Sequence, residues 1–311
     1  VLWFHFTTGA VKTAPALSKD ENESTVFVGS QDKSFYAFNA VTGAIRWQYS
    51  STRFIEASPV VTRSGIVLTA GTSSYTVFAF NATTGAVLWS WFNTNRGLFR
   101  VALALSEDES RVYVGDNLDT MHCFAVDPAA PQRELWSVSA GGAINSAATV
   151  TPGRTLLNKP FVFEIIFGSD DQALYIVNGE TGKTAVSANF RHGKIQSAPS
   201  LMYSSTSNTD WSQMLLTSTE SGVVMGIQHR VPFDEDDSRS LKRAWTYDVE
   251  TGTSGKHLLH RVNQTTGYYL VGTSGGSLYC FDAAKGDVLF ELEGFEGGLN
   301  PDEPLLLDGN I

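Results

Sequence analysis

The chain has 311 residues, a formal net charge of -10 at pH 7, 42% hydrophobic residues and only 17% charged residues. Low charge together with 28 glycines and many aromatic side chains is typical of a globular chain rich in strands and turns, and it excludes disorder. The negative charge argues against nucleic acid as a partner, because phosphate contacts need a basic surface, and no apolar run approaches the roughly 20 residues that cross a bilayer.

One motif recurs along the chain. It begins with Asn or Asp, continues through two variable residues and Thr-Gly, and ends four residues after the Gly on a Trp or another apolar residue. Clear copies span residues 38–47, 80–89, 177–186 and 281–290; looser copies end at Trp136 and Trp245, and a truncated copy ends at Trp3. Successive motif ends lie between 42 residues (47 to 89) and 59 residues (186 to 245) apart. This period, built from short strands, is typical of β-propeller blades.

Each repeat divides into four predicted strands. The second strand ends in Gly or another small residue, the third alternates between apolar and polar residues, and the fourth contains the final Trp position. The first and innermost strand carries small residues and often Pro. We expect innermost strands at Lys12–Leu17, Ile55–Val61, Phe99–Leu105, Ile144–Val150, Ile195–Leu201 and Lys256–Val262.

The recurring motif has a local physical reason. Asn or Asp can accept a hydrogen bond from the backbone two residues further on, and Gly takes the positive φ that closes a tight turn. The Trp that follows is a large apolar plate with one N–H donor. On an outer strand it can wedge between neighbouring blades, so we expect a structural role for Trp3, Trp47, Trp89, Trp136 and Trp245.

The Asn/Asp-x-x-Thr-Gly-x-x-x-Trp motif, preceded by a Val-x-Val-Gly strand, resembles the repeats of the PQQ-type (quinoprotein alcohol dehydrogenase-like) propellers. The resemblance covers essentially the whole chain and implies an all-β propeller of four-stranded antiparallel blades, comparable in architecture to WD40 and YVTN propellers. Quinone-dependent dehydrogenases, a propeller lipoprotein of bacterial outer-membrane assembly, lumenal sensor domains and appendages of adenylate-forming enzymes all use this repeat. Membership therefore does not fix function.

We expect one propeller domain over residues 1–311. The complete blades are predicted at about residues 11–50, 55–92, 98–138, 143–189, 195–248 and 256–293. Residues 1–6 resemble a fourth strand without its first three, and residues 299–311 resemble an innermost strand without its last two. These pieces predict a seventh, split blade and ends typical of an excerpt, with an eight-bladed parent as the alternative.

One set of positions could bind a ligand. Aligning the innermost strands places six polar residues at equivalent positions, where they would form a ring at one mouth of the central channel: Lys12, Glu56, Arg100, Asn145, Gln196 and His257. In quinone enzymes that resemble this chain, the cofactor lies over this end. The alternative is that these residues are polar because a channel lining faces water.

Other signals for chemistry are weak. The resembling quinone enzymes carry adjacent cysteines, a calcium ion and an Asp base, whereas this chain has only the separate Cys123 and Cys280. Because both occupy the blade position of Ala37 and Ala79, we expect small buried core residues. No catalytic residue, metal ligand or cofactor is predicted, and a PQQ cofactor is kept only as an alternative. The acidic run 234–237 predicts a solvated loop.

Three N-glycosylation sequons begin at Asn22, Asn81 and Asn263, about as many as chance predicts for this motif. All three fall in predicted turns or loops, where a glycan could be tolerated. The compartment is not fixed by the sequence, although the extracellular space, the periplasm and the endoplasmic reticulum lumen are favoured.

The predicted function is a non-catalytic propeller that serves as a protein-interaction scaffold or a lumenal or extracellular binding module. Alternatives are a quinone-dependent oxidoreductase and a sensor or appended domain of a larger enzyme. Rigid scaffolds carry function on their loops, so protein partners are expected there. The longest predicted loops are Asp127–Arg133, Thr151–Pro160, Ser204–Ser212 and Gln228–Leu241.

Overall fold

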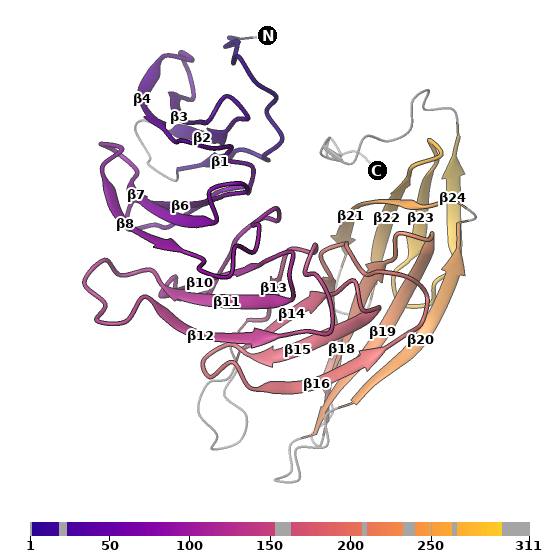
Figure 1. The fold of residues 1–311 in the computed structure, drawn as a ribbon. Coiled ribbons are helices and arrows are strands. Elements are labelled where there is room, and N and C mark those ends of the chain that lie inside the picture. The colour runs from indigo at the N-terminus through magenta and orange to yellow at the C-terminus, as the bar shows by residue number, and fades with distance from the viewer. Residues whose placement is uncertain are drawn as a thin grey trace. The chain divides into compact units, whose positions relative to one another are not determined.

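The structure is a computed structural model that describes residues 2–18, 24–152, 163–206, 210–232, 240–249, 251–262 and 266–293. Its regular elements are strands that form six four-stranded antiparallel sheets, named here sheets 1 to 6 in chain order (Figure 1). Within the described residues, no helix is long and apolar enough to cross a membrane. The prediction of an all-β propeller built of four-stranded blades is confirmed, whereas the seventh blade stays a prediction.

The chain divides into two compact units, Val1–Ser139 and Ala140–Ile311, and each contains three sheets. Its organisation as one domain stays a prediction. The strands of the first unit are β1 (Ala16–Leu17), β2 (Thr25–Gly29), β3 (Ser34–Asn39) and β4 (Ile45–Ser50) in sheet 1, β5 (Val60–Val61), β6 (Ile66–Gly71), β7 (Thr76–Asn81) and β8 (Val87–Phe92) in sheet 2, and β9 (Ala104–Leu105), β10 (Arg111–Gly115), β11 (Thr120–Ala125) and β12 (Glu134–Ser139) in sheet 3.

The second unit repeats the same order. Its strands are β13 (Thr149–Val150), β14 (Glu164–Gly168), β15 (Ala173–Asn178) and β16 (Thr184–Asn189) in sheet 4, β17 (Ser200–Thr206), β18 (Asp210–Ser218), β19 (Val223–Pro232) and β20 (Ser240–Asp248) in sheet 5, and β21 (Thr253–Arg261), β22 (Gly267–Thr273), β23 (Leu278–Asp282) and β24 (Val288–Leu292) in sheet 6. In every sheet the strands pair in chain order, so each fourth strand is an outer edge.

The recurring motif forms the turn between the third and fourth strands. In sheet 1 the Oδ1 atom of Asn39 accepts hydrogen bonds from the backbone N–H groups of Val41 and Thr42, at 3.0 and 2.9 Å. Gly43 then takes a φ of 72°. The same acceptor pattern recurs at Asn81, Asn178 and Asp282. The predicted turn chemistry is therefore confirmed in four sheets.

Trp47 and Trp89 each pack onto the turn of the next sheet. The indole Nε1 of Trp47 donates a 2.8 Å hydrogen bond to the carbonyl of Ala82, and a Cβ at Gly85 would lie 2.7 Å from the Trp47 ring. Trp89 likewise donates to the carbonyl of Val126 at 3.2 Å. The indole thus needs a bare glycine below it and a carbonyl beside it, which the turn supplies. Trp47 and Trp89 therefore lie between their own sheet and the turn of the next, which is the placement that the predicted structural role requires.

A register shift between the third and fourth strands falls at the same place in all six sheets. The residue just before the shift pairs with the Trp position, and in five sheets it is Ala, Cys or Gly. The pairs are Ala37–Trp47, Ala79–Trp89, Cys123–Trp136, Ile176–Val186, Gly226–Trp245 and Cys280–Phe290. A small residue leaves room for the bulky partner; at position 226, a Cβ would overlap the Trp245 indole.

The innermost strands of sheets 1 to 4 are shorter than predicted, with two paired residues each. The preceding residues reach the second strand through a side chain instead. The Thr13 hydroxyl accepts from the N–H of Gly29 and donates to its carbonyl, and Ser146 does the same with Gly168. At these positions a side-chain hydroxyl bonds to both the N–H and the carbonyl of the glycine. Backbone pairing between the strands is therefore replaced there.

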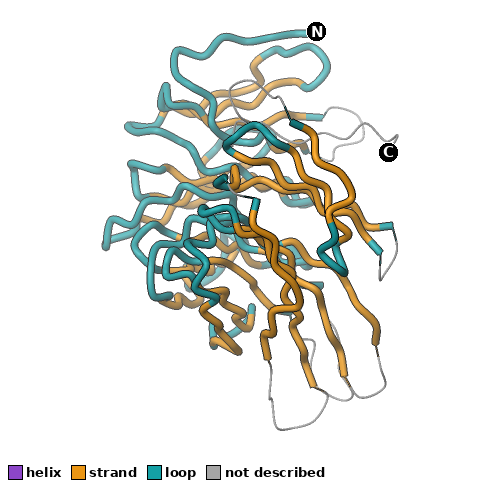
Figure 2. Tube along the Cα trace, turned by 90° about the vertical axis from the view of Figure 1, so that its right-hand side faces the viewer, coloured by secondary structure: helices purple, strands orange, loops and turns teal. Residues whose placement is uncertain are grey.

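Sheet 5 is larger than predicted. β18, β19 and β20 contain nine, ten and nine residues, against five or six in the corresponding strands of sheets 1 to 4. The predicted loops Ser204–Ser212 and Gln228–Leu241 are therefore partly strand, since β18 begins at Asp210 and β19 continues to Pro232. Figure 2 shows these strands extending beyond their neighbours (Figure 2).

We expect that Trp47→Ala lowers the free energy of unfolding by about 3 kcal/mol, the lower end of the loss for a buried aromatic side chain, because Trp47 is only partly buried. Trp47→Phe should lose less, because the ring contact stays and only the bond to Ala82 goes. Denaturant titration measures both, with Val41→Ala as a control because Val41 is 76% exposed. Equal stability of Trp47→Ala and the parent chain would contradict the role of this side chain.

Candidate functional site

The residues predicted to ring the channel mouth share a repeated backbone setting. The N–H of Asp170 donates to the carbonyl of Ala143 at 2.9 Å, and the N–H of Glu220 donates to that of Lys194 at 3.0 Å. Equivalent bonds run from Gln31 to Ala10 and from Asn117 to Leu98. In each case the predicted ring residue lies two positions after the acceptor carbonyl; these residues are Lys12, Arg100, Asn145 and Gln196.

Of the two other predicted ring residues, Glu56 shares this position and His257 does not. Glu56 follows Ile55, whose N–H donates to Ser30 just as the N–H of Ile195 donates to Ser169, so Glu56 matches Gln196. His257 does not share this register. The N–H of Ser274 donates to the carbonyl of Gly252, which makes residue 254 the equivalent position. The innermost strand of sheet 6 begins earlier than predicted, and His257 lies three residues further along β21.

In the second unit, two of the predicted residues meet at one carboxylate. The carboxamide of Asn145 donates to Asp170 Oδ2 at 3.1 Å, and that of Gln196 donates to Asp170 Oδ1 at 2.9 Å. The ammonium of Lys194 lies 3.9 Å from Asp170 Oδ2 and 3.7 Å from Glu220 Oε2. The result is a polar cluster in which two carboxylates face one ammonium, so it carries net negative charge.

In the first unit, the carboxylate of Glu56 accepts a hydrogen bond from the Gln31 carboxamide at 2.5 Å, whereas Lys12 and Arg100 are exposed. Sequence reasoning missed Gln31, Asp170 and Glu220, although a signal was present. Each lies two positions after the small residue that ends the second strand of its sheet. The sequence pattern there was interpreted as a turn and not as part of a site.

His257 is partly buried and packs against sheets 5 and 6. Its Nε2 lies 2.8 Å from the carbonyl oxygen of Ala198, and its ring centroid lies 5.1 Å from that of Tyr269. Burial lowers the pKa of His257 to about 4, and the bond to Ala198 offsets this only in part. A neutral, packed imidazole of this kind serves the core of sheets 5 and 6 rather than a ligand site.

A second polar feature lies at the turn between the second and third strands. In sheets 1 and 4 a tyrosine hydroxyl donates to a turn aspartate: Tyr36 to Asp32 at 2.7 Å, and Tyr175 to Asp171 at 2.5 Å. Burial and the neighbouring Asp171 raise the pKa of Tyr175 to about 12. In sheet 3 the same third-strand position is His122, which pairs with Val114 across the ladder.

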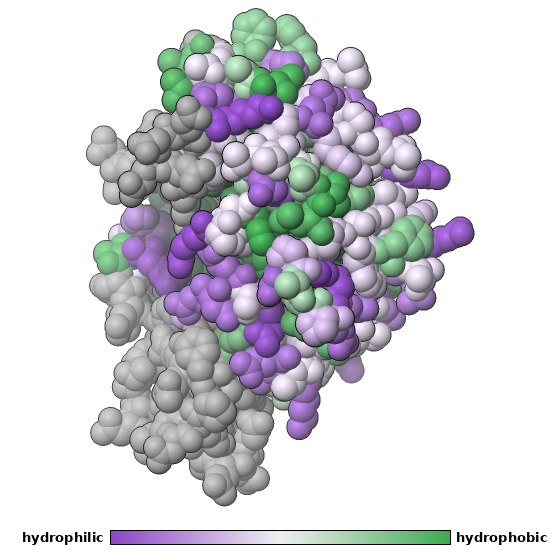
Figure 3. All heavy atoms as spheres, turned by 90° about the vertical axis from the view of Figure 1, so that its left-hand side faces the viewer, coloured by the Kyte–Doolittle hydropathy of each residue, from purple (hydrophilic) through white to green (hydrophobic). Residues whose placement is uncertain are grey.

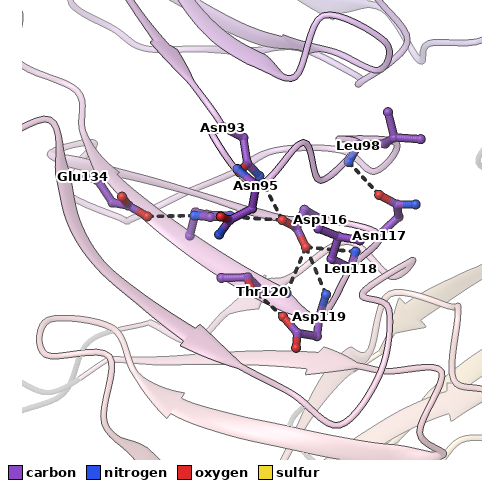
Figure 4. A network of polar contacts seen from close by, with 10 residues as sticks. Asn93, Asn95, Leu98, Asp116, Asn117, Leu118, Asp119, Thr120 and Glu134 are labelled. Carbon is purple, nitrogen blue, oxygen red and sulfur yellow. Dashed lines mark hydrogen bonds and ion pairs between the residues drawn. The ribbon is translucent and has the colours of Figure 1, made fainter.

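His122 lies between two carboxylates. Its Nδ1 is 2.8 Å from Glu134 Oε1 and its Nε2 is 3.3 Å from Asp116 Oδ2. Asn93 donates to the same Asp116 oxygen at 2.9 Å, and the other oxygen accepts from the backbone of residues 118–120. Figure 4 shows Asp116 at the centre of this network (Figure 4). His122 is 4% exposed and Asp116 is 1% exposed.

The charges of this network stabilise each other. Burial opposes the charged imidazole, but the hydrogen bonds to Asp116 and Glu134 outweigh it and raise the pKa of His122 above 6.5. Burial likewise opposes ionised Asp116, but the bonds from His122 and from backbone N–H groups lower its pKa below 3.8. Because both ring nitrogens are engaged by carboxylates, none is left for a reacting group, as a general base would require. The network is a buried ion cluster rather than a catalytic triad.

The family model described as outer membrane protein assembly factor BamB matches residues 20–118. This matched segment, about a third of the chain, is similar to PQQ-like propeller repeats. The match covers β2 to β10, and the turn and Trp contacts described above continue in the same pattern beyond it. A search of curated proteins found no match.

The two cysteines, Cys123 and Cys280, are free and buried. Each pairs with the large residue of the neighbouring outer strand, Cys123 with Trp136 and Cys280 with Phe290. Burial raises the pKa of the Cys123 thiol to about 12 and raises that of Cys280. Both therefore occupy the small-residue position expected from Ala37 and Ala79.

The remaining predicted sites are placed only in part. Asn81 lies in the turn of sheet 2, where its Oδ1 accepts the two turn N–H groups, while Asn22 and Asn263 lie outside the described residues. So does the acidic run 234–237. Glycosylation stays a prediction. Over the described part of the chain, no group of three or more His, Cys, Asp or Glu side chains is arranged to hold a metal ion.

Replacing His122 by Gln removes the charge of the buried cluster. Because the folded His122 has a pKa above 6.5, its stabilisation is complete below that pH and is lost as the pH rises through the folded value. We expect the difference in unfolding free energy between the parent chain and His122→Gln to shrink on going from about pH 6 to about pH 9. Urea titrations across this range measure it; a constant difference would contradict the assignment.

The thiols give a separate prediction. We expect Cys123 and Cys280 to react with an aromatic disulfide reagent at pH 8 at least about a hundredfold more slowly in the native chain than in urea, because the thiolate is the reactive form. The absorbance of the released thiol measures the rates. Rapid labelling of the native chain at either position would contradict the buried placement.

Proposed function

We propose that this chain is a non-catalytic propeller that acts as a protein-interaction scaffold. The match of residues 20–118 to the model of an outer membrane assembly factor carries the proposal, because the printed function of that family is assembly. A rigid set of sheets that presents loops and outer edges suits this role. The proposal concerns this chain's binding surfaces and names no partner protein.

Exposed apolar side chains support the proposal. Along the outer strands and turns of the matched segment, Val41 is 76% exposed, Ile45 and Val87 are 44% exposed, and Phe92 is 52% exposed. On the face drawn in Figure 3, hydrophobic residues gather in groups among polar ones (Figure 3). Contiguous exposed apolar groups rimmed by polar residues are typical of protein-contact surfaces.

One predicted loop is preorganised for contact. In the loop Asp127–Arg133, the guanidinium of Arg133 donates to the carbonyls of Ala125, Asp127 and Pro128. The same guanidinium lies 4.4 Å above the ring of Trp89. These contacts fix the loop while Ala129 and its neighbours stay exposed. A loop ordered before binding loses less entropy when a partner docks.

The ring positions give less support to a quinone-dependent oxidoreductase. Pyrroloquinoline quinone carries several carboxylates, whereas the cluster around Asp170 in the second unit holds two carboxylates against Lys194. Like charges at close range oppose binding of such an anion. The described residues of this cluster therefore do not fit the cofactor.

Affinity capture with the full chain as bait tests the scaffold proposal. We expect Ala129→Lys with Phe92→Ser to reduce the amount of each specifically captured protein by about tenfold, the effect of losing one well-packed contact. Val262→Ser is the control, because Val262 is 54% exposed but lies neither in the loop Asp127–Arg133 nor in the matched segment. Unchanged capture by the first variant would overturn the assignment of these surfaces.

A quinone titration followed by absorbance provides the opposing test. We expect no saturable spectral change when pyrroloquinoline quinone is added to the full chain. Saturable binding that is lost in Arg100→Ala or Lys194→Ala would contradict the scaffold proposal and support the oxidoreductase alternative.

A further inference from the structure

The three sheets of the first unit carry exposed cations at one end of their strands. In an antiparallel sheet whose strands follow chain order, the turn between the second and third strands and the connection to the next sheet lie at the same end. Lys33 lies in such a turn, Arg53 lies in the connection from β4 to β5, and Arg96 and Arg100 lie in the connection from β8 to β9. Lys12 precedes β1, in a segment whose backbone bonds to the turn of sheet 1. All five residues are exposed, and we refer to them as the basic end.

The carboxylates at the same end of the first unit do not neutralise these cations. Asp32, Glu56 and Asp119 are partly buried, and each accepts a side-chain hydrogen bond at 2.5 to 2.7 Å. Asp116 belongs to the buried cluster around His122. Within the described part of the chain, none of the five cations forms an ion pair. The formal net charge of -10 includes these five positive charges, so the remaining residues sum to -15. The basic end is therefore a local exception on an acidic chain.

Aromatic side chains lie among these cations. Phe54 follows Arg53 and is 39% exposed, and Phe92 at the end of β8 is 52% exposed. Tyr75 lies in the turn of sheet 2, and its ring centroid is 6.2 Å from that of Phe92. A Cβ on the last residue of β6, beside the same turn, would lie 3.3 Å from the carbonyl oxygen of Phe54. Phe54, Tyr75 and Phe92 therefore form an aromatic strip over the turn of sheet 2, with Arg53 next to Phe54 and Arg96 four residues after Phe92.

Two side chains at this end occupy a position where other sheets have glycine. The residue before the third strand has a φ of 99° at Gly222 in sheet 5 and 87° at Gly276 in sheet 6. In sheets 1 and 2 the same position is Lys33 and Tyr75, with φ of 73° and 55°. A Cβ is unfavourable in this left-handed region, so a side chain kept there indicates a use for it. In sheet 4 that use is visible, because Gln172 accepts a backbone hydrogen bond at 3.4 Å. The ammonium of Lys33 has no such bond to a described residue, which points to a use outside the chain.

We propose that the basic end and its aromatic strip bind an acidic segment of a partner protein that carries an apolar side chain between its carboxylates. This inference rests on the proposed scaffold function and names the chemistry of the partner. Complementary charge steers association and sets specificity, while arginine and aromatic side chains are the residues that contribute most to protein contacts. The cations at either side of the strip would face the carboxylates, and the strip would face the apolar side chain.

The charge of the whole chain favours a short protein segment over a larger polyanion. A nucleic acid or an anionic membrane extends beyond a patch of five cations and also meets the field of the remaining residues, which sum to -15. A short acidic segment can lie within the basic end and avoid most of that repulsion. The exposed rings add an apolar contact that a phosphate backbone does not use.

A fluorescein-labelled peptide, Glu-Asp-Glu-Phe-Glu-Asp-Glu, tests the proposal by fluorescence anisotropy with the full chain. We expect saturable binding that weakens about tenfold in Arg53→Gln with Arg96→Gln, because two charge contacts are lost. Lys183→Gln with Lys285→Gln is the matched control and should bind normally. It changes the net charge equally, and both residues are exposed in turns between third and fourth strands, at the other end of their sheets.

A second pair of changes separates the aromatic contact from charge attraction. Phe54→Ser in the chain, and Ser in place of Phe in the peptide, should each weaken binding about fivefold. Denaturant titration verifies that the Phe54→Ser chain is folded, and the change in the peptide needs no such check.

Several results would overturn the proposal. They are absence of saturable binding, equal loss of binding in the arginine pair and in the lysine control, and binding that ignores both aromatic changes. Tighter binding of a single-stranded oligonucleotide, or of phosphatidylcholine vesicles with a quarter phosphatidylserine, would make a polyanion the occupant if the arginine pair abolished it. Failure of peptide binding with intact, loop-dependent capture would refute the acidic segment alone. Intact peptide binding with capture that does not depend on the loop would refute only the loop assignment.

Discussion

The contact between an outer-strand tryptophan and the turn of the next sheet is the interaction on which the rest of the fold depends. The Asn39 type of turn fixes its own backbone through one carboxamide oxygen and leaves a glycine at positive φ. That glycine offers a flat surface on which an indole can lie, and a neighbouring carbonyl satisfies the indole N–H. The contact thus couples a local turn, set by a few residues of sequence, to packing between sheets.

Sheet 3 and sheet 5 show what happens when the turn changes. In sheet 3 the turn lacks the Thr-Gly pair, and the guanidinium of Arg133 covers Trp89 in place of the bare glycine. In sheet 5 the sequence between β19 and β20 lacks the Thr-Gly pair, and the preceding sheet has Val186 where sheets 1, 2, 3 and 5 have Trp. The two halves of the contact are lost together, and aliphatic packing of Val186 with Ile176 and Ile227 replaces them. The packing between two neighbouring sheets therefore depends on the residues of those two sheets, as in other repeat architectures.

The sequence was sufficient for features that depend on short stretches of chain. The turns, the Trp contacts and the small residue at Cys123 follow from spacing and side-chain size. The short innermost strands were not predictable, because a Thr13 hydroxyl that replaces backbone pairing has the same sequence signature as a strand residue. The His122 cluster was also missed, because its partners come from separate strands and a turn. His257 was placed in the wrong register because β21 begins earlier than its pattern suggested.

The contact between sheets 4 and 5, where Val186 stands in place of a tryptophan, has a geometric consequence. An indole that must contact one glycine and one carbonyl fixes the distance between the outer strand and the turn of the next sheet. It therefore limits how long the strands of a hairpin can be. Where Val186 takes the place of that indole, this limit is relaxed, and the hairpins of the following sheet lengthen outward to nine and ten residues. Among the described strands, the longest, β19 with ten residues, lies in the sheet that follows this change from Trp to Val.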